Sequence, residues 1–218
     1  MSYLTNPDNW DLSVSTSIPN LLFEQLYVTF VSLAIAVLIA FPLALLVARY
    51  RRLYTPVLTT TSILYTIPSL AAFAFLIPVT GLAAPTVIIP LVIYSQVVLI
   101  RNIVAAIRSV DPALVEVGRA MGMNRWQLQL RVILPLALPV IVAGFRVATV
   151  TAIGIATLGF LVGVDTLGYA IQQGFNFASR DQVIGGVILV SALAIAADLL
   201  LLAVERWLGR GREIVPAG

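Results

Sequence analysis

The sequence contains no lysine, no histidine and no cysteine, and all thirteen of its basic residues are arginine. Without lysine it has neither a phosphate-loop lysine nor a Schiff-base lysine, which excludes the standard ATPase site. Without histidine or cysteine the usual zinc sites, Ser–His and Cys–His nucleophile pairs and histidine-ligated haem are excluded. The lack of cysteine also excludes disulfides and leaves the redox compartment open. We therefore expect a chain that performs no chemistry and binds no cofactor of its own.

Charge is also scarce: 11% of the 218 residues are charged and 60% are hydrophobic. Soluble domains carry about 25% charged residues. With a mean hydropathy of +1.02, the composition favours an all-α integral membrane protein with one membrane domain. The net charge of +3 is explained by arginines that flank membrane segments, so we expect no nucleic-acid partner.

Five apolar stretches are long enough to cross a bilayer, because a transmembrane helix needs about 20 such residues. They run approximately over residues 26–48, 57–79, 85–104, 136–164 and 183–204. The predicted organisation is a short extracytoplasmic segment, a transmembrane domain and a cytoplasmic tail, over residues 1–20, 21–209 and 210–218.

The distribution of arginine predicts the orientation. In an alternating five-span topology, eleven arginines lie on one side, Arg180 lies on the other, and Arg146 falls within a span. Because basic residues concentrate in cytoplasmic loops, we expect the N-terminus outside and the C-terminus inside. The residues before the first span are acidic rather than basic, which is the reverse of a cleavable signal peptide.

The longest cytoplasmic loop, residues 108–135, has helix signals of its own. Asp111 precedes a proline, which is typical of an N-cap, and Gly122 follows the next nine residues at a C-cap position. A second helix start at Asn124, with Gln127 three residues later, forms a capping box and leads to a break at 134–135. From spacing alone, a connector helix on the membrane surface is an equally good interpretation.

A longer pattern favours a specific function for this loop. Glu116-Val117-Gly118-x-x-x-Gly122, followed after nine residues by Val132-Ile133-Leu134-Pro135, resembles the E-A-A-x-x-x-G-(x9)-I-x-L-P signature of binding-protein-dependent ABC importer permeases. The chain departs from that signature where two alanines are usual and at the first isoleucine. The resemblance implies a type I ABC importer permease fold whose cytoplasmic coupling helix sits in a cleft of an ATPase. The residues it assigns to this contact are Asp111, Glu116, Gly118, Arg119, Met121, Gly122, Arg125, Leu134 and Pro135.

Other segments resemble the osmoprotectant branch of that family, among them 67–71, 108–114, 134–141 and 151–158. This implies a transport subunit for glycine betaine, carnitine or choline in a bacterial or archaeal cytoplasmic membrane. The implied partners are two ATPase subunits that bind ATP and Mg, a second permease subunit, identical or paralogous, and an extracytoplasmic substrate-binding protein. A permease for methionine or ergothioneine, or an autonomous channel or secondary transporter, is the alternative.

Arg146 and Asp198 are the only full charges well inside the predicted spans, where a charge is costly unless it is paired or wetted. From the rise per residue, Arg146 lies roughly 16 Å from Pro135 and Asp198 roughly 12 Å from Arg206, which gives similar depths. We predict an ion pair that ties the fourth and fifth spans near the inner mouth of the pathway, with independent snorkelling as the alternative. Pro68, inside the second span, is a further candidate for the pathway.

Overall fold

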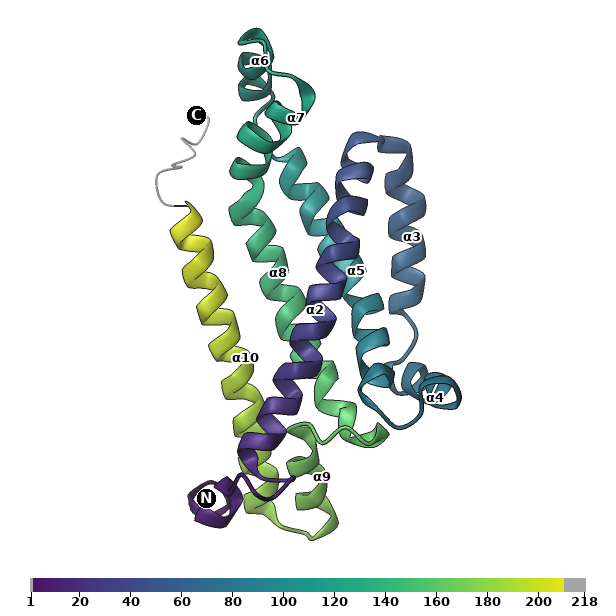
Figure 1. The fold of residues 1–218 in the computed structure, drawn as a ribbon, viewed down its shortest axis with the longest axis vertical. Helices are drawn as coiled ribbons and strands as arrows, with labels where there is room; N and C mark the ends of the chain where they lie inside the picture. Colours follow the sequence, from purple (N-terminus) through teal and green to yellow (C-terminus); the bar gives the residue numbers. More distant parts are fainter. Residues whose placement is uncertain (1, 210–218) are drawn as a thin grey trace.

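The computed structural model describes residues 2–209, which contain helices and loops but no strand (Figure 1). Four helices are long and apolar enough to cross a membrane unaided. They are α2 (Ile18–Arg49), α5 (Ala84–Arg108), α8 (Leu134–Ala156) and α10 (Arg180–Gly209). The shorter helices are α1 (Ser2–Thr5), α3 (Tyr54–Tyr65), α4 (Ser69–Thr80), α6 (Pro112–Ala120), α7 (Arg125–Leu128) and α9 (Gly168–Asn176). The remaining elements are three 3-10 turns and one π-helical turn. The 3-10 turns are η1 (Pro7–Trp10), η2 (Arg51–Leu53) and η4 (Thr157–Val162), and the π-helical turn is η3 (Gln129–Ile133).

The core lies where α5 packs against α2 on one side and α8 on the other. Ala36, Ala40 and Ala44 of α2 are fully buried, and their spacing of four residues puts them on one face of the helix. Small side chains on one face let helix backbones approach closely, which replaces the hydrophobic driving force that is missing between helices in lipid. Gln96 of α5 reaches this face and donates a hydrogen bond to the Ala36 carbonyl at 3.2 Å.

The second predicted span is not one straight helix. Within the stretch 57–79, α3 ends at Tyr65, α4 begins at Ser69, and the two helices meet at 85°. Pro68 is the N-cap residue of α4 and has an extended backbone, with φ −59° and ψ 135°. A proline disfavours the helical conformation of the residue before it, so α3 cannot continue through Ile67. The predicted interruption at Pro68 is present, as a sharp bend between two helices.

The predicted break at Leu134–Pro135 is also absent. Residues 125–162 form one helical rod of 38 residues that includes α7, η3, α8 and η4. In η3 the helix widens, and the Leu134 N–H donates to the Gln129 carbonyl, five residues earlier. Pro135 has no N–H to offer to the Arg131 carbonyl, and the π turn immediately before it absorbs this irregularity without ending the helix.

Two further boundaries differ from expectation. Helix α2, which contains the first predicted span, begins at Ile18, ahead of the apolar stretch that starts near residue 26. The predicted polar loop over 165–181 contains a helix, α9, which packs against α10. The predicted tail, 210–218, lies outside the described residues.

Gly168, the first residue of α9, makes the closest backbone approach among the described glycines. A Cβ atom there would lie 1.8 Å from the Thr157 carbonyl oxygen, whereas a Cβ atom at Gly154 would meet nothing within 4 Å. We therefore expect Gly168→Ala to reduce the free energy of unfolding by about 1–3 kcal/mol through overpacking. Thermal unfolding of the detergent-purified protein measures the effect. Gly154→Ala is the matched control, and equal unfolding temperatures for the two variants would contradict this packing.

Candidate functional site

The cytoplasmic loop predicted from the sequence folds into a separate lobe, α6 with α7, at the end of the molecule opposite α9 (Figure 1). We call residues 111–128 the α6–α7 lobe. The Asp111 carboxylate accepts a hydrogen bond from the Ala113 N–H at 2.8 Å, and Pro112 occupies the first turn. This N-cap is the one that the sequence predicts, and it satisfies a backbone donor that the first turn of α6 leaves free.

The end of α6 depends on Gly122. Its φ is +78°, a left-handed conformation that glycine adopts without strain. The Gly122 N–H donates to the Arg119 carbonyl at 3.0 Å, and the Met123 N–H donates to the Gly118 carbonyl at 3.2 Å. These two bonds form a Schellman motif, which turns the chain sharply toward α7.

The start of α7 follows at once. The Asn124 side chain accepts from the Gln127 N–H and the Gln127 side chain accepts from the Asn124 N–H, both at 2.9 Å. This reciprocal pair is the capping box predicted from the sequence. Because both ends of the turn between α6 and α7 are fixed by hydrogen bonds, the lobe is built as one rigid unit.

Gly118 explains why the chain departs from the double alanine of the signature. It is buried against α7, and a Cβ atom there would lie 2.6 Å from Leu128 Cδ1 and 3.5 Å from Met123 Sδ. Real Cβ atoms essentially never come so close, so Leu128 would have to move if the residue were alanine. The glycine therefore leaves room for the end of the Leu128 side chain against α6.

The outer surface of the lobe is apolar and exposed. Leu114, Val117 and Met121 of α6 are 46%, 57% and 72% exposed, and Trp126 of α7 is 74% exposed. Exposed apolar residues gathered in one place indicate a contact surface. The charged members of the predicted contact set, Glu116, Arg119 and Arg125, are also exposed on this lobe.

Two members of the predicted set lie elsewhere. Leu134 and Pro135 are half-buried at the start of α8, below the π turn. They belong to the helix that follows the lobe and are not part of the exposed surface of the lobe.

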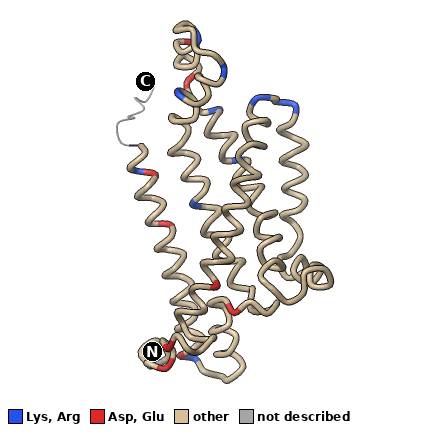
Figure 2. The backbone as a smooth tube through the Cα atoms, in the orientation of Figure 1, with Lys and Arg blue, Asp and Glu red and all other residues tan. Residues whose placement is uncertain are grey.

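Positive charge concentrates at the same end of the molecule (Figure 2). Arg49, Arg51 and Arg52 lie at the turn from α2 to α3, and all three are exposed. A hydrogen bond from Arg49 and its charge, reinforced by the charge of Arg125, lower the pKa of Tyr50. Because Arg125 belongs to the lobe, its charge and those of the α2–α3 turn act on the same surface.

The predicted intramembrane pair forms, and it has a third member. Arg146 of α8 donates from Nε and Nη2 to the two carboxylate oxygens of Asp198 at 3.0 and 2.9 Å. Its Nη1 donates to Glu205 Oε2 at 2.6 Å. The Arg146, Asp198 and Glu205 side chains are 20%, 37% and 27% exposed. We call these three residues the ion cluster.

Sequence reasoning missed Glu205 because it lies just beyond the predicted end of the fifth span. The signal that identifies it is its spacing: Asp198 and Glu205 are seven residues apart, which puts them on the same face of α10 two turns from each other. Among residues 2–209, no group of three or more His, Cys, Asp or Glu side chains is placed to hold a metal ion.

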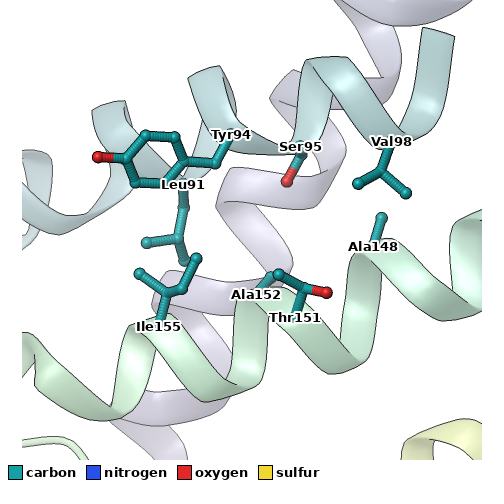
Figure 3. A pocket seen from close by; sticks show the side chains of 8 residues that line it. All are labelled: Leu91, Tyr94, Ser95, Val98, Ala148, Thr151, Ala152 and Ile155. Carbon is teal, nitrogen blue, oxygen red and sulfur yellow. The ribbon is translucent and has the colours of Figure 1, made fainter. Parts of the chain in front are cut away.

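A small hollow lies between α5 and α8 (Figure 3), lined by Leu91, Tyr94, Ser95, Val98, Ala148, Thr151, Ala152 and Ile155. The Tyr94 hydroxyl donates to the Ile67 carbonyl at 2.8 Å. The rings of Tyr94 and Tyr65 lie edge to face, with their centroids 5.7 Å apart. Tyr94 therefore joins the hollow to the break between α3 and α4. Neither Pro68 nor the ion cluster lines this hollow.

The family of binding-protein-dependent transport system inner membrane components matches residues 36–210, most of the chain and all of its long helices except the first half of α2. This chain belongs to that family.

Related permeases match most of both chains. The carnitine transport permease protein OpuCD of Listeria monocytogenes is 44% identical over 79% of this chain and 78% of its own. The glycine betaine/carnitine/choline transport system permease protein OpuCD of Bacillus subtilis is 44% identical over 78% and 75%. The osmoprotectant import permease protein OsmW of Salmonella typhimurium is 35% identical over 84% and 87%.

Solved structures agree on the fold. A chain of the MetNI methionine ABC transporter, in an inward-facing conformation, is 25% identical with a TM-score of 0.77. The match covers 94% of this chain and 99% of that one. The fold is therefore that of a type I ABC importer permease.

The ion cluster yields a test of its own. Arg146→Ala leaves two carboxylates without their shared cation, so we expect it to lower the yield of assembled protein about tenfold. Asp198→Ala leaves Arg146 with its single bond to Glu205, so we expect a smaller loss. The swap of Arg146→Asp with Asp198→Arg should recover part of that loss, measured by size-exclusion chromatography of equal membrane samples. Additive losses in the doubly substituted protein would show that the two side chains do not depend on each other.

Proposed function

We propose that this chain is the transmembrane subunit of an ATP-driven importer for compatible solutes such as glycine betaine, carnitine and choline. The observation that carries the proposal is the 44% identity to permeases named for these solutes, over about three-quarters of both chains. The methionine transporter shares the fold at only 25% identity, which favours the osmoprotectant branch over a methionine permease. Membership in a binding-protein-dependent family disfavours an autonomous channel or secondary transporter.

We further propose five spans, with α3 and α4 as a broken second span, the N-terminus outside and the C-terminus inside. The concentration of arginine at the end that carries α6 and α7 supports this orientation, because basic residues remain on the cytoplasmic side (Figure 2). Pro68 and the residues just before it are exposed in the single chain, and non-helical backbone is tolerated at membrane depth only when it is buried in protein or lines a water-filled cavity. A broken second span therefore requires that a second permease subunit or the pathway cover this break. The proposed location is the bacterial or archaeal cytoplasmic membrane.

The α6–α7 lobe is the proposed contact with a cytoplasmic ATPase. Its exposed apolar residues and its rigid, doubly capped turn support this role. Two ATPase subunits would bind ATP and Mg and hydrolyse ATP, while this chain and a second permease subunit form the pathway. A substrate-binding protein would deliver solute at the opposite end. ATP drives import only if ATP and the binding protein favour different access states of the permease.

Charge reversal on the lobe tests the ATPase contact. In the assembled transporter, we expect Glu116→Lys to abolish the solute-stimulated part of ATP hydrolysis, because it places a positive charge in a cleft suited to a carboxylate. The measurement is ATP hydrolysis in proteoliposomes with binding protein and glycine betaine, choline, carnitine or methionine. Glu24→Lys makes the same change of charge near the opposite end and serves as the control for co-purification of the ATPase. If Glu116→Lys keeps wild-type solute stimulation of ATP hydrolysis, the lobe does not couple the permease to the ATPase. If methionine alone stimulates ATP hydrolysis, the proposed solute class is wrong.

Thiol labelling tests the orientation, because the native chain has no cysteine. Leu12, 71% exposed in the N-terminal segment, and Tyr50, 50% exposed at the α2–α3 turn, offer accessible positions. An impermeant maleimide added to intact cells should label Leu12→Cys but label Tyr50→Cys only after permeabilisation. The reverse pattern would invert the orientation. Labelling at both positions in sealed cells would contradict an odd number of crossings between them.

A further inference from the structure

The two ends of α10 are attached to the rest of the chain in different ways. Near its start, Gly185 and Gly186 are its only buried residues in the described part of the chain. A Cβ atom at Gly185 would lie 2.7 Å from the Tyr3 ring, and one at Gly186 would lie 2.7 Å from Ile171 of α9. This end is held by close backbone packing against α1 and α9.

The other half of α10 has no buried residue, and its apolar side chains are exposed or half-buried. In that half, Asp198 and Glu205 are the residues bonded to α8, through the guanidinium of Arg146. Packing between apolar helices gains little in lipid, so a charged contact there sets position more strongly than the neighbouring apolar ones. α8 and α10 also pack against each other, and the ion cluster adds the charged bonds that fix this half of α10 to α8.

Arg146 also lies on the rod that begins at the α6–α7 lobe. Residues 125–162 are continuous, and Arg146 stands about 32 Å along the rod from Arg125 at 1.5 Å per residue. A displacement of the lobe that tilts or rotates this rod therefore moves the guanidinium. Because an arginine fork bonded to both oxygens of a carboxylate has a fixed orientation, that movement is imposed on α10.

The two carboxylates respond differently to such a movement. If α10 pivots where Gly186 packs, Asp198 lies about 18 Å and Glu205 about 28 Å from the pivot, so Glu205 travels farther for a given tilt. Asp198 is held by two hydrogen bonds and Glu205 by one. The Glu205 bond is therefore the first to break, while Asp198 keeps the arginine paired.

We propose that the ion cluster is a two-position clasp, in which Arg146 is a positioning residue that couples the α6–α7 lobe to α10. The Arg146–Asp198 fork persists throughout the cycle and fixes the register of the two helices. The Arg146–Glu205 bond is made in one access state and broken in the other. This role rests on the proposed function, since it requires an ATPase that moves the lobe, but it does not depend on which solute is carried.

Distances between spin labels test the clasp in the complete transporter, with its ATPase partner, in lipid nanodiscs. Val140→Cys on α8 and Val204→Cys on α10 place labels at positions that are 42% and 44% exposed, at depths similar to the ion cluster. Val150→Cys with Val187→Cys, 38% and 47% exposed, reports on the half of α10 nearer α9. Labelled chain diluted with unlabelled chain leaves only distances within one chain.

In the wild-type background, ATP with vanadate should shift the 140–204 distance from one narrow distribution to another and leave the 150–187 distance unchanged. Glu205→Gln should merge the two 140–204 states into one broad distribution. It should also reduce stimulated ATP hydrolysis about 3- to 10-fold at equal assembled yield, the difference between a charged and a neutral hydrogen bond. Arg206→Gln, an exposed charge removed from the adjacent position, should change neither readout.

Arg146→Lys provides a second variant, because it keeps the charge and loses the planar fork. It should broaden the 140–204 distribution even where assembly is normal. A 140–204 distance that does not respond to ATP with vanadate, or that stays narrow in Glu205→Gln and Arg146→Lys, overturns the clasp. Failure of every quaternary ammonium solute to stimulate ATP hydrolysis in the wild-type transporter would instead overturn the proposed solute class, while the label distances would still report on the clasp.

Discussion

The cost of an unsatisfied polar group in hydrocarbon constrains this structure more than any other interaction. In lipid, backbone groups and charges must find partners within the protein. Between α3 and α4, the Tyr94 hydroxyl donates to the Ile67 carbonyl, which lies outside both helices. Buried glutamines bond backbone carbonyls in the same way. The side-chain amide of Gln25 donates to the Ile153 carbonyl, and that of Gln96 donates to the Ala36 carbonyl. The ion cluster is the strongest instance of this constraint, because a guanidinium inside the bundle requires carboxylates beside it.

Much of the fold could be predicted because the relevant signals are local. Apolar length locates the long helices, and the caps at Asp111, Gly122 and Asn124 depend on residues within a few positions of one another. The pairing of Arg146 with Asp198 could be predicted because two charges at similar depth in adjacent helices have no better partners. The resemblance to a permease family predicts a coupling helix in the loop that forms the lobe. The comparisons confirm the family and the branch to which its relatives belong.

The features that sequence reasoning missed depend on contacts rather than on local pattern. Hydropathy cannot distinguish a straight span from two apolar helices at 85°, so the angle of the bend at Pro68 could not be predicted. The sequence predicts a helix break at Pro135, because no sequence pattern indicates the π turn that accommodates this proline. Helix α9 was missed because it contains polar and glycine residues, and the need for glycine at position 168 comes from the Thr157 carbonyl, eleven residues away.

The distribution of packing along α10 gives the molecule its mechanical asymmetry. At the α9 end, glycines bring backbones so close that movement there would require several contacts to break together, since packed interiors resist continuous deformation. Toward the other end, α10 has no buried residue, and its packing against α8 includes directional charged bonds, which an arginine can exchange between neighbouring acceptors without being left unpaired. In the proposed clasp, a helix fixed at one end and exchangeable at the other would open on one side of the membrane while it remains closed on the other. The α6–α7 lobe, the proposed contact with an ATPase, lies at the end of the molecule toward which this half of α10 runs (Figure 1), so the part of the structure proposed to move is also the part on which an ATPase would act.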